Sequence, residues 1–192
     1  MRLHLVRHGL PEIDPTTPAS SWLLDPGADA GIEALRGSGV LPGDAVWLSS
    51  VEPKALATAQ RLSPDGSCGS VEGLHEAERP ADWLSQEEFT AAVRRSFAHP
   101  DEAARKSWEP LTEVGVRVAT AVGAVVNEAR QVDATDVVLV GHGTAWTLLV
   151  SALIGEAPDL DSWELMSMPD HCSIDVDARV IVSRWGHWRA AL

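Results

Sequence analysis

Two histidines in this sequence occupy matching contexts that favour anion chemistry. The tripeptide Arg7-His8-Gly9 follows the apolar run 3–6, and the dipeptide His142-Gly143 follows the apolar run 137–140. Imidazole can act as a nucleophile or carry a proton, and a guanidinium group binds oxyanions through two parallel donors. A glycine after each histidine lets the chain turn sharply and lets a ligand approach the backbone. The sequence therefore predicts one anion-handling site built from both histidines.

We interpret the remaining histidines as structural. An isolated histidine near a strand end is more often a hydrogen-bonded structural residue than a catalytic one. His8 and His142 are set apart because their contexts repeat. The other five are His4, His75, His99, His171 and His187.

The elements that must position this site alternate between strand and helix. Apolar and β-branched runs predict strands over 2–7, 44–50, 68–72, 137–141, 172–177 and 180–185. Helical periodicity predicts helices over 28–37, 53–63, 85–98, 111–131 and 144–155. This alternation implies a largely parallel sheet with helices on both faces, and ligands gather at the carboxyl ends of such strands.

Three segments complete this expected organisation. The last two strands form a hairpin through Asp177-Ala178. The proline-rich segment 10–27 is expected to be a loop over the ligand end of the sheet, and the polar segment 73–110 is the expected lid. Because no repeat or linker interrupts the pattern, we expect residues 1–192 to form a single domain.

Composition restricts the classes of partner. The net charge of −13 argues against nucleic-acid binding, and a phosphorylated substrate would have to be attracted by a local positive pocket. No apolar run reaches the length of a membrane span, and we expect a cytoplasmic protein with no membrane association. The two cysteines have no CxxC partner, so neither a disulfide framework nor a zinc site is expected. The oligomeric state is left open.

Four motifs in order resemble those of the histidine phosphatase superfamily, the phosphoglycerate mutase-like proteins. They are Arg7-His8-Gly9, the stretch 49–59 (Ser-Ser-Val-Glu-Pro-Lys-Ala-Leu-Ala-Thr-Ala), Leu74-His75-Glu76 and Gly141-His142-Gly143. The resemblance runs from residue 2 to about residue 155, and four ordered motifs are far more specific than the Arg-His-Gly triplet alone. It implies a three-layer α/β/α sandwich with a mostly parallel central sheet.

The resemblance also implies a site that needs neither metal nor cofactor. His8 would be the nucleophile and form a phosphohistidine, while Arg7 and His142 would bind the phosphate oxygens and Gly143 would leave room for them. Glu76 would be the general acid, with its pKa raised by the bound phosphate dianion so that it can donate a proton. These roles describe a histidine acid-type phosphatase.

Two positions depart from the family pattern. Lys54 stands where the family usually has a second arginine, so it keeps the charge but lacks the bidentate fork. The alternative for Lys54 is a solvated residue in the first turn of a helix. Asp14 stands where the family usually has asparagine, and we favour a turn-forming loop residue for it over a phosphate contact.

Three functions remain open on the sequence. The leading hypothesis is hydrolysis of a small phosphomonoester through phosphorylated His8. The second is mutase-type phosphoryl transfer, and the third is a phosphate-binding pseudoenzyme, which Lys54 and Asp14 would support. Hydrolysis is favoured because Leu10-Pro11 replaces a common polar pair, and because acidic residues outnumber Arg79 in the lid segment. These acids are Glu78, Asp82, Glu87 and Glu88.

Overall fold

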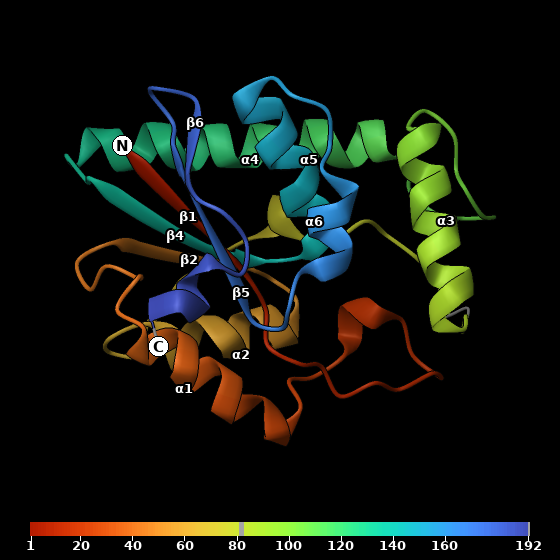
Figure 1. Cartoon of the computed structure of the whole chain (residues 1–192), viewed down its shortest axis with the longest axis horizontal. Helices are drawn as coiled ribbons and strands as arrows, with labels where there is room; N and C mark the ends of the chain where they lie inside the picture. Colours follow the sequence, from red (N-terminus) through yellow and green to blue (C-terminus); the bar gives the residue numbers. More distant parts are fainter. Residues whose placement is uncertain (81–82, 192) are drawn as a thin grey trace.

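A six-stranded sheet forms the centre of the molecule. The computed structural model describes residues 1–80 and 83–191. In the order β3-β2-β4-β1-β5-β6, the first four strands run parallel, and β5 is antiparallel to both of its neighbours. The strands are β1 (Arg2–Arg7), β2 (Val46–Ser50), β3 (Gly69–Val71), β4 (Asp136–Gly141), β5 (Asp170–Asp175) and β6 (Val180–Ser183). The predicted mostly parallel sheet and the hairpin of its last two strands are confirmed (Figure 1).

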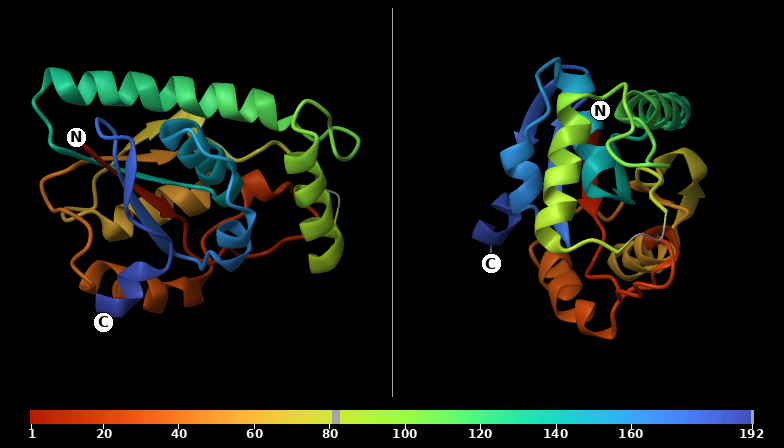
Figure 2. Two further views of the ribbon diagram at one scale, coloured as in Figure 1. Left: turned by 45° about the horizontal axis from the view of Figure 1, so that its top comes forward. Right: turned by 90° about the vertical axis from the view of Figure 1, so that its right-hand side faces the viewer.

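Helices cover both faces of this sheet, which confirms the predicted three-layer arrangement. The helices α1 (Asp29–Gly37) and α2 (Pro53–Leu62) pack on one face, and α4 (Leu111–Gln131) and α5 (Gly143–Ile154) pack on the other. The helix α3 (Gln86–Ala98) stands at the end of the molecule far from the N-terminus (Figure 2). A short helix, α6 (Leu160–Leu165), precedes β5.

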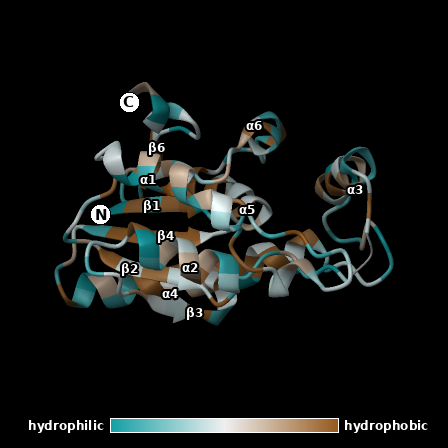
Figure 3. Ribbon diagram, turned by 90° about the horizontal axis from the view of Figure 1, so that it is seen from below, coloured by the Kyte–Doolittle hydropathy of each residue, from teal (hydrophilic) through white to brown (hydrophobic). Residues whose placement is uncertain are grey.

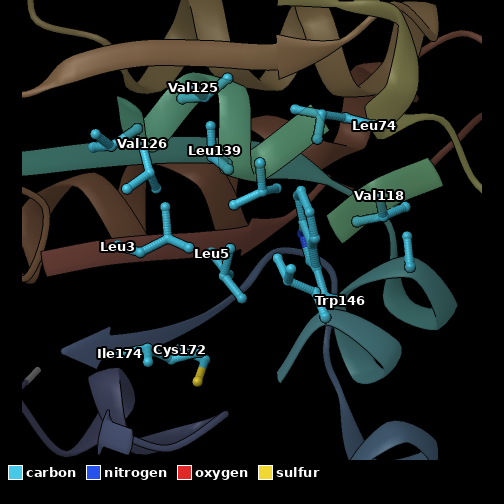
Figure 4. Close-up of a cluster of buried hydrophobic side chains, with 14 of the residues drawn as sticks. Leu3, Leu5, Leu74, Val118, Val125, Val126, Leu139, Trp146, Cys172 and Ile174 are labelled. Atoms are coloured by element: carbon cyan, nitrogen blue, oxygen red, sulfur yellow. The ribbon is translucent and has the colours of Figure 1, made fainter. Parts of the chain in front are cut away.

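Alternate side chains of β1 pack into separate hydrophobic cores. Leu3 and Leu5 point to the α4 and α5 side, where they meet Trp146 and Leu139 (Figure 4). Val6 belongs to the core beneath α1 and α2. Because apolar side chains leave both faces, the strand reads as one continuous apolar run, as expected for a parallel strand buried on both sides. In Figure 3, β1 is coloured largely in the brown that marks hydrophobic residues.

The predicted elements differ from the observed ones mainly at their ends. Each predicted strand and helix is present within a few residues of its expected bounds, while α6 was not predicted. Segment 10–27 is a loop with two short 3-10 turns, Ala19–Ser21 and Pro26–Ala28, and an isolated bridge between Pro11 and Leu24. Within the described residues, no helix has both the length and the apolar character required to cross a membrane.

Candidate active site

The carboxyl ends of β1 and β4 bring the two predicted histidines together. The two strands are parallel neighbours with Arg7 opposite Gly141, and the His8 N–H donates to the Gly141 carbonyl at 3.0 Å. The chain therefore places His8 and His142 at the same point of the sheet edge. Their ring centroids lie 5.2 Å apart at an interplanar angle of 63°.

His8 is held in one tautomer. Its Nδ1 lies 2.6 Å from the Gly9 carbonyl oxygen, and because a carbonyl only accepts, Nδ1 carries the proton. The lone pair is then on Nε2, which is the atom a nucleophilic imidazole needs. Burial, followed by the charges of His142 and Lys54, lowers the pKa of His8 well below its usual value. The ring is therefore neutral at ordinary pH.

His142 faces two side chains from the segment between β2 and α2. Its Nε2 lies 2.9 Å from Ser50 Oγ and 3.4 Å from Glu52 Oε1. Its Nδ1 is buried and has no hydrogen-bond partner among the described residues. Burial lowers the pKa of His142 to about 3.

Arg7 approaches the same point from β1. Its Nη1 donates to the Met166 carbonyl at 2.7 Å, while its Nε is buried without a partner in the described part of the chain. A methyl group on Gly143 would lie 3.5 Å from that Nε and 3.5 Å from Trp163 Nε1. Gly143 therefore leaves the space beside the Arg7 guanidinium open, as the predicted phosphate contact requires.

Glu76 reaches the site by capping α5. Its carboxylate accepts hydrogen bonds from the N–H groups of Ala77 at 2.9 Å, Thr144 at 3.1 Å and Ala145 at 3.1 Å. Burial alone would raise the pKa of Glu76, but the charges of Arg79 and His142 and these hydrogen bonds lower it to about 2. The sequence predicts that a bound phosphate dianion raises the pKa of Glu76. The protein's own groups, without phosphate, lower that pKa instead.

Lys54 lies inside the site, and its charge is already paired. It is buried, its Nζ donates to the Ala19 carbonyl at 2.6 Å, and it forms an ion pair with Glu52. Glu52 is also buried, and its Oε1 accepts the Glu76 N–H at 2.8 Å. The solvated position considered for Lys54 is therefore wrong, and the ion pair with Glu52 limits what Lys54 can offer a phosphate.

Asp14 lies in an exposed turn, which confirms the prediction that it is a turn-forming loop residue. Its carboxylate accepts hydrogen bonds from the Thr16 N–H at 2.9 Å and from the Thr16 hydroxyl at 2.7 Å. These bonds to Thr16 lower the pKa of Asp14. The carboxylate is thus used to stabilise the turn.

Two of the five histidines set aside as structural form a buried pair across β1 and β5. His4 Nδ1 lies 3.1 Å from His171 Nε2, and His4 Nε2 lies 3.0 Å from Asp136 Oδ1. This pair is anchored to the sheet by the Asp136 carboxylate.

Sequence reasoning missed three polar side chains that meet at this site. The sequence predicts for Arg79 only a positive charge that partly offsets the acidic residues of segment 73–110. In the structure its Nη2 donates to Thr144 Oγ1 at 3.1 Å. Glu52 and Thr58 were not singled out, although Thr58 accepts the Gly9 N–H at 2.9 Å. Their positions in the motif 49–59 were the available signal for the last two.

The acids of the lid segment do not act as a group. Glu88 completes a capping box with Ser85 at the start of α3, and Glu78 is exposed. Asp82 lies outside the described residues.

The arrangement is suited to binding an oxyanion. Two buried N–H donors around the start of α5, Arg7 Nε and Arg79 Nε, have no acceptor among the described residues, and the buried His142 Nδ1 has no partner there either. A buried donor without an acceptor costs free energy, so such donors together favour a ligand that carries several acceptor oxygens. The α5 N-terminus adds a partial positive charge that also favours an anion.

Comparisons with known proteins agree on one family and one fold. The model of the histidine phosphatase superfamily (branch 1) matches residues 3–179. A mutant phosphoserine phosphatase from Entamoeba histolytica, in complex with phosphoserine, has a TM-score of 0.71 and 16% identity, covering 100% of this chain and 99% of its own. No curated protein sequence matches this chain.

Two further solved structures have the same fold. A mycobacterial glucosyl-3-phosphoglycerate phosphatase in complex with VO3 has a TM-score of 0.68 and 20% identity, covering 91% of this chain and 92% of its own. The α-ribazole phosphatase of Shigella flexneri has a TM-score of 0.67 and 16% identity, with coverages of 96% and 95%.

Proposed function

Because the chain belongs to branch 1 of the histidine phosphatase superfamily, we propose that it is a metal-independent, histidine acid-type phosphatase. Its substrate is a small phosphomonoester, the class of compound named for the structural neighbours, and residues 1–192 act as one domain. The side chains of Arg7 and Arg79, with the α5 N-terminus, supply the positive charge that a metal would otherwise provide.

The observation that carries the proposal is the tautomer of His8. The Gly9 carbonyl fixes the proton on Nδ1 at 2.6 Å, and burial keeps the ring neutral through a lowered pKa. Nε2 is therefore a nucleophile without needing a separate base. Arg7 Nε is a buried donor without an acceptor among the described residues at the same strand ends, which supports binding of the phosphoryl oxygens there.

The first step transfers the phosphoryl group to His8. A bond forms between Nε2 and phosphorus while the bond from phosphorus to the ester oxygen breaks, and that oxygen takes a proton from the Glu76 carboxyl group. With a pKa of about 2, Glu76 is ionised before the substrate binds. The proton therefore arrives with the substrate as its phosphate monoanion, since the second pKa of a phosphomonoester is about 6. The bound monoanion passes this proton to the Glu76 carboxylate and becomes the dianion before the ester bond breaks.

The second step releases phosphate. The Glu76 carboxylate takes a proton from a water molecule as the water oxygen attacks phosphorus, and the bond to Nε2 breaks. His8 returns to its neutral form with the proton still on Nδ1, and inorganic phosphate leaves as the monoanion, carrying away the proton that Glu76 took and leaving Glu76 ionised again. Glu76 thus serves as acid and then as base, as microscopic reversibility requires.

A phosphohistidine trap tests this mechanism. The protein is incubated briefly in EDTA with acetyl phosphate that carries radioactive phosphorus, and the label on the protein is tested for stability. We expect an acid-labile, base-stable label on the wild type and none on His8→Ala, whose turnover falls by several orders of magnitude. His187→Ala is the matched control, because His187 is exposed at the start of the C-terminal 3-10 helix.

The same experiment separates the alternatives. A wild-type protein that binds phosphate but is never labelled is the phosphate-binding pseudoenzyme. A labelled protein that returns the group to a second acceptor rather than to water is a mutase. Labelling of His8→Ala to the wild-type level, or activity that is lost in EDTA and restored by magnesium, would rule out the proposed mechanism.

A further inference from the structure

Arg79 stands beside the same helix end as the two histidines. Its Nη2 donates to Thr144 Oγ1 at 3.1 Å, and the Thr144 N–H donates to the Glu76 carboxylate at 3.1 Å. Thr144 is the second residue of α5, and His142 is the N-cap of that helix. Thr144 thus links the Arg79 guanidinium to the carboxylate of Glu76, the proposed acid, at the helix end where His142 stands.

Two aromatic rings hold this guanidinium in place. Its central carbon lies 5.2 Å from the centroid of Phe89 and 4.9 Å from that of Trp108, and the two ring centroids are 6.1 Å apart. Trp108 is 6% exposed, which makes its ring a fixed part of the core below α3. Aromatic faces attract a cation but do not neutralise its charge or use its N–H donors. The rings therefore position Arg79 and leave its donors available.

Within the described part of the chain, Arg79 also lacks a bonded counter-charge. Among the residues that the structure describes, no hydrogen bond or ion pair links it to a carboxylate, and its Nε is buried without an acceptor. Lys54 differs on each of these points, because its Nζ contacts both Glu52 and the Ala19 carbonyl. Of these two cations, Arg79 is the one that has an N–H donor without an acceptor among the described residues.

We propose that Arg79 is, after Arg7, the second phosphate-binding guanidinium of this site, while Lys54 mainly balances Glu52. The proposal rests on the proposed function for the identity of the ligand. It also links binding to proton transfer, because Arg79 is the largest charge that stabilises ionised Glu76. A phosphate dianion that pairs with Arg79 offsets this stabilisation and lets Glu76 hold a proton when one is needed.

Inorganic phosphate is the probe that tests this role. Its dissociation constant is measured by calorimetry for the wild type, Arg79→Lys and Arg79→Met. Arg79→Lys keeps the charge but loses the planar fork, so we expect phosphate to bind about tenfold more weakly, and Arg79→Met to bind weaker still. Arg94→Lys is the matched control, since Arg94 lies on α3 and bonds Glu164 at the surface.

Circular dichroism and the unfolding midpoint show whether each variant is folded. If Arg79→Met does not fold, Arg79→Lys alone decides. Phosphate affinity in folded Arg79→Lys equal to that of the wild type would overturn the proposal, as would a wild type that does not bind phosphate. Loss of affinity in Arg79→Lys alone, with Arg94→Lys unchanged, would support it.

Failure of the proposed function gives a different result. A wild type that neither hydrolyses phosphomonoesters nor becomes labelled on His8, yet loses phosphate affinity in Arg79→Lys, would retain the Arg79 site without the enzyme. Normal turnover with unchanged phosphate affinity in Arg79→Lys would keep the enzyme and remove Arg79 from the site.

Discussion

Glu76 is held ionised by groups from two parts of the chain, the segment 77–79 and the start of α5. Its carboxylate accepts N–H bonds from Ala77, Thr144 and Ala145, and Arg79 stands next to Thr144. Each of these partners favours the charged form over the protonated form. An acid stabilised in this way can donate a proton only after its surroundings change, and a bound phosphate dianion is a change of the required sign.

Replacement of Glu76 by glutamine tests its role in proton transfer. We expect Glu76→Gln to slow phosphorylation of His8 by an alkyl phosphomonoester by roughly 10²–10⁴-fold, because an alkoxide leaves poorly without a proton. The rate with p-nitrophenyl phosphate should fall far less, because nitrophenolate is a good leaving group. The measurement is the single-turnover rate with each substrate. Equal losses would make Glu76 a positioning residue, since weaker phosphate binding affects both substrates alike.

Single residues could be predicted only where a sequence motif carried them. The motifs identified His8, His142, Arg7 and Glu76, which the fold brings to one end of the sheet. The positions of Arg79 and Glu52 in the site could not be predicted, because they depend on the side chains that each one contacts in the folded protein. Arg79 is defined by two aromatic rings, Phe89 and Trp108, from later segments, and Glu52 by Lys54 and the Glu76 backbone.

The junction between β4 and α5 sets the position of His142. Trp146 lies one turn into α5, is completely buried, and donates its indole N–H to the Val6 carbonyl at 2.9 Å. A methyl group on Gly141, the last residue of β4, would lie 2.5 Å from Trp146 Cζ2. Glycine at this position therefore allows strand, ring and helix to pack closely enough for His142 to face His8.

Gly141→Ala should disturb both the packing and the site. We expect a loss of about 1–3 kcal/mol in unfolding free energy, the usual cost of forcing extra volume into a close-packed core, together with a lower kcat as His142 shifts. Urea unfolding and steady-state kinetics measure the two effects. Gly123→Ala on α4 is the control, because a methyl group there meets nothing within 4 Å and alanine in a helix gains about 0.5–1 kcal/mol. An unchanged unfolding midpoint for Gly141→Ala would show that Trp146 adjusts freely.

Helices and strands were predictable where the apolar pattern was long. The helix over 111–131 was predicted with its observed bounds, since Val114, Val118, Val122 and Val125 recur at helical spacing on a buried face. The helix α6 has only six residues and buries only Trp163, too little for periodicity to show. Its formation depends on the Asp159 cap and on packing beside α5.

Four histidines are buried in the folded protein in forms that resist protonation. Burial lowers the pKa of His4, lowers that of His8 well below its usual value, and lowers those of His142 and His171 to about 3. In the unfolded chain, each titrates near 6.5. Below that pH the unfolded state binds more protons than the folded state, so stability falls as the pH falls.

The molecule should therefore be unusually sensitive to mild acid. His142 and His171, whose pKa is lowered to about 3, each remove about 1 kcal/mol of unfolding free energy between pH 6.5 and 5.5, against a typical total of about 5–15 kcal/mol. The lowered pKa of His4 and of His8 acts in the same direction. Urea unfolding at a series of pH values should show this slope begin below pH 6.5, before most carboxylates titrate. His171→Asn should reduce the slope by about one proton's worth, or about 1.4 kcal/mol per pH unit. A stability curve that is flat from pH 7 to 5 would contradict this expectation.

The strand β1 lies in the interior of the sheet, between β4 and β5, although both partners come much later in the chain. During synthesis, β2 and β3 can pair early, whereas β1 has no neighbour until Asp136–Gly141 has been made. Leu3, Leu5 and Val6, which have no exposure in the finished protein, must stay in contact with solvent or another surface until then. Such delayed, non-local pairing slows folding and exposes a strand to pairing with other chains. The interior position of β1 sets His8 beside His142. For the same reason, β1 must remain unpaired during synthesis until β4 has been made.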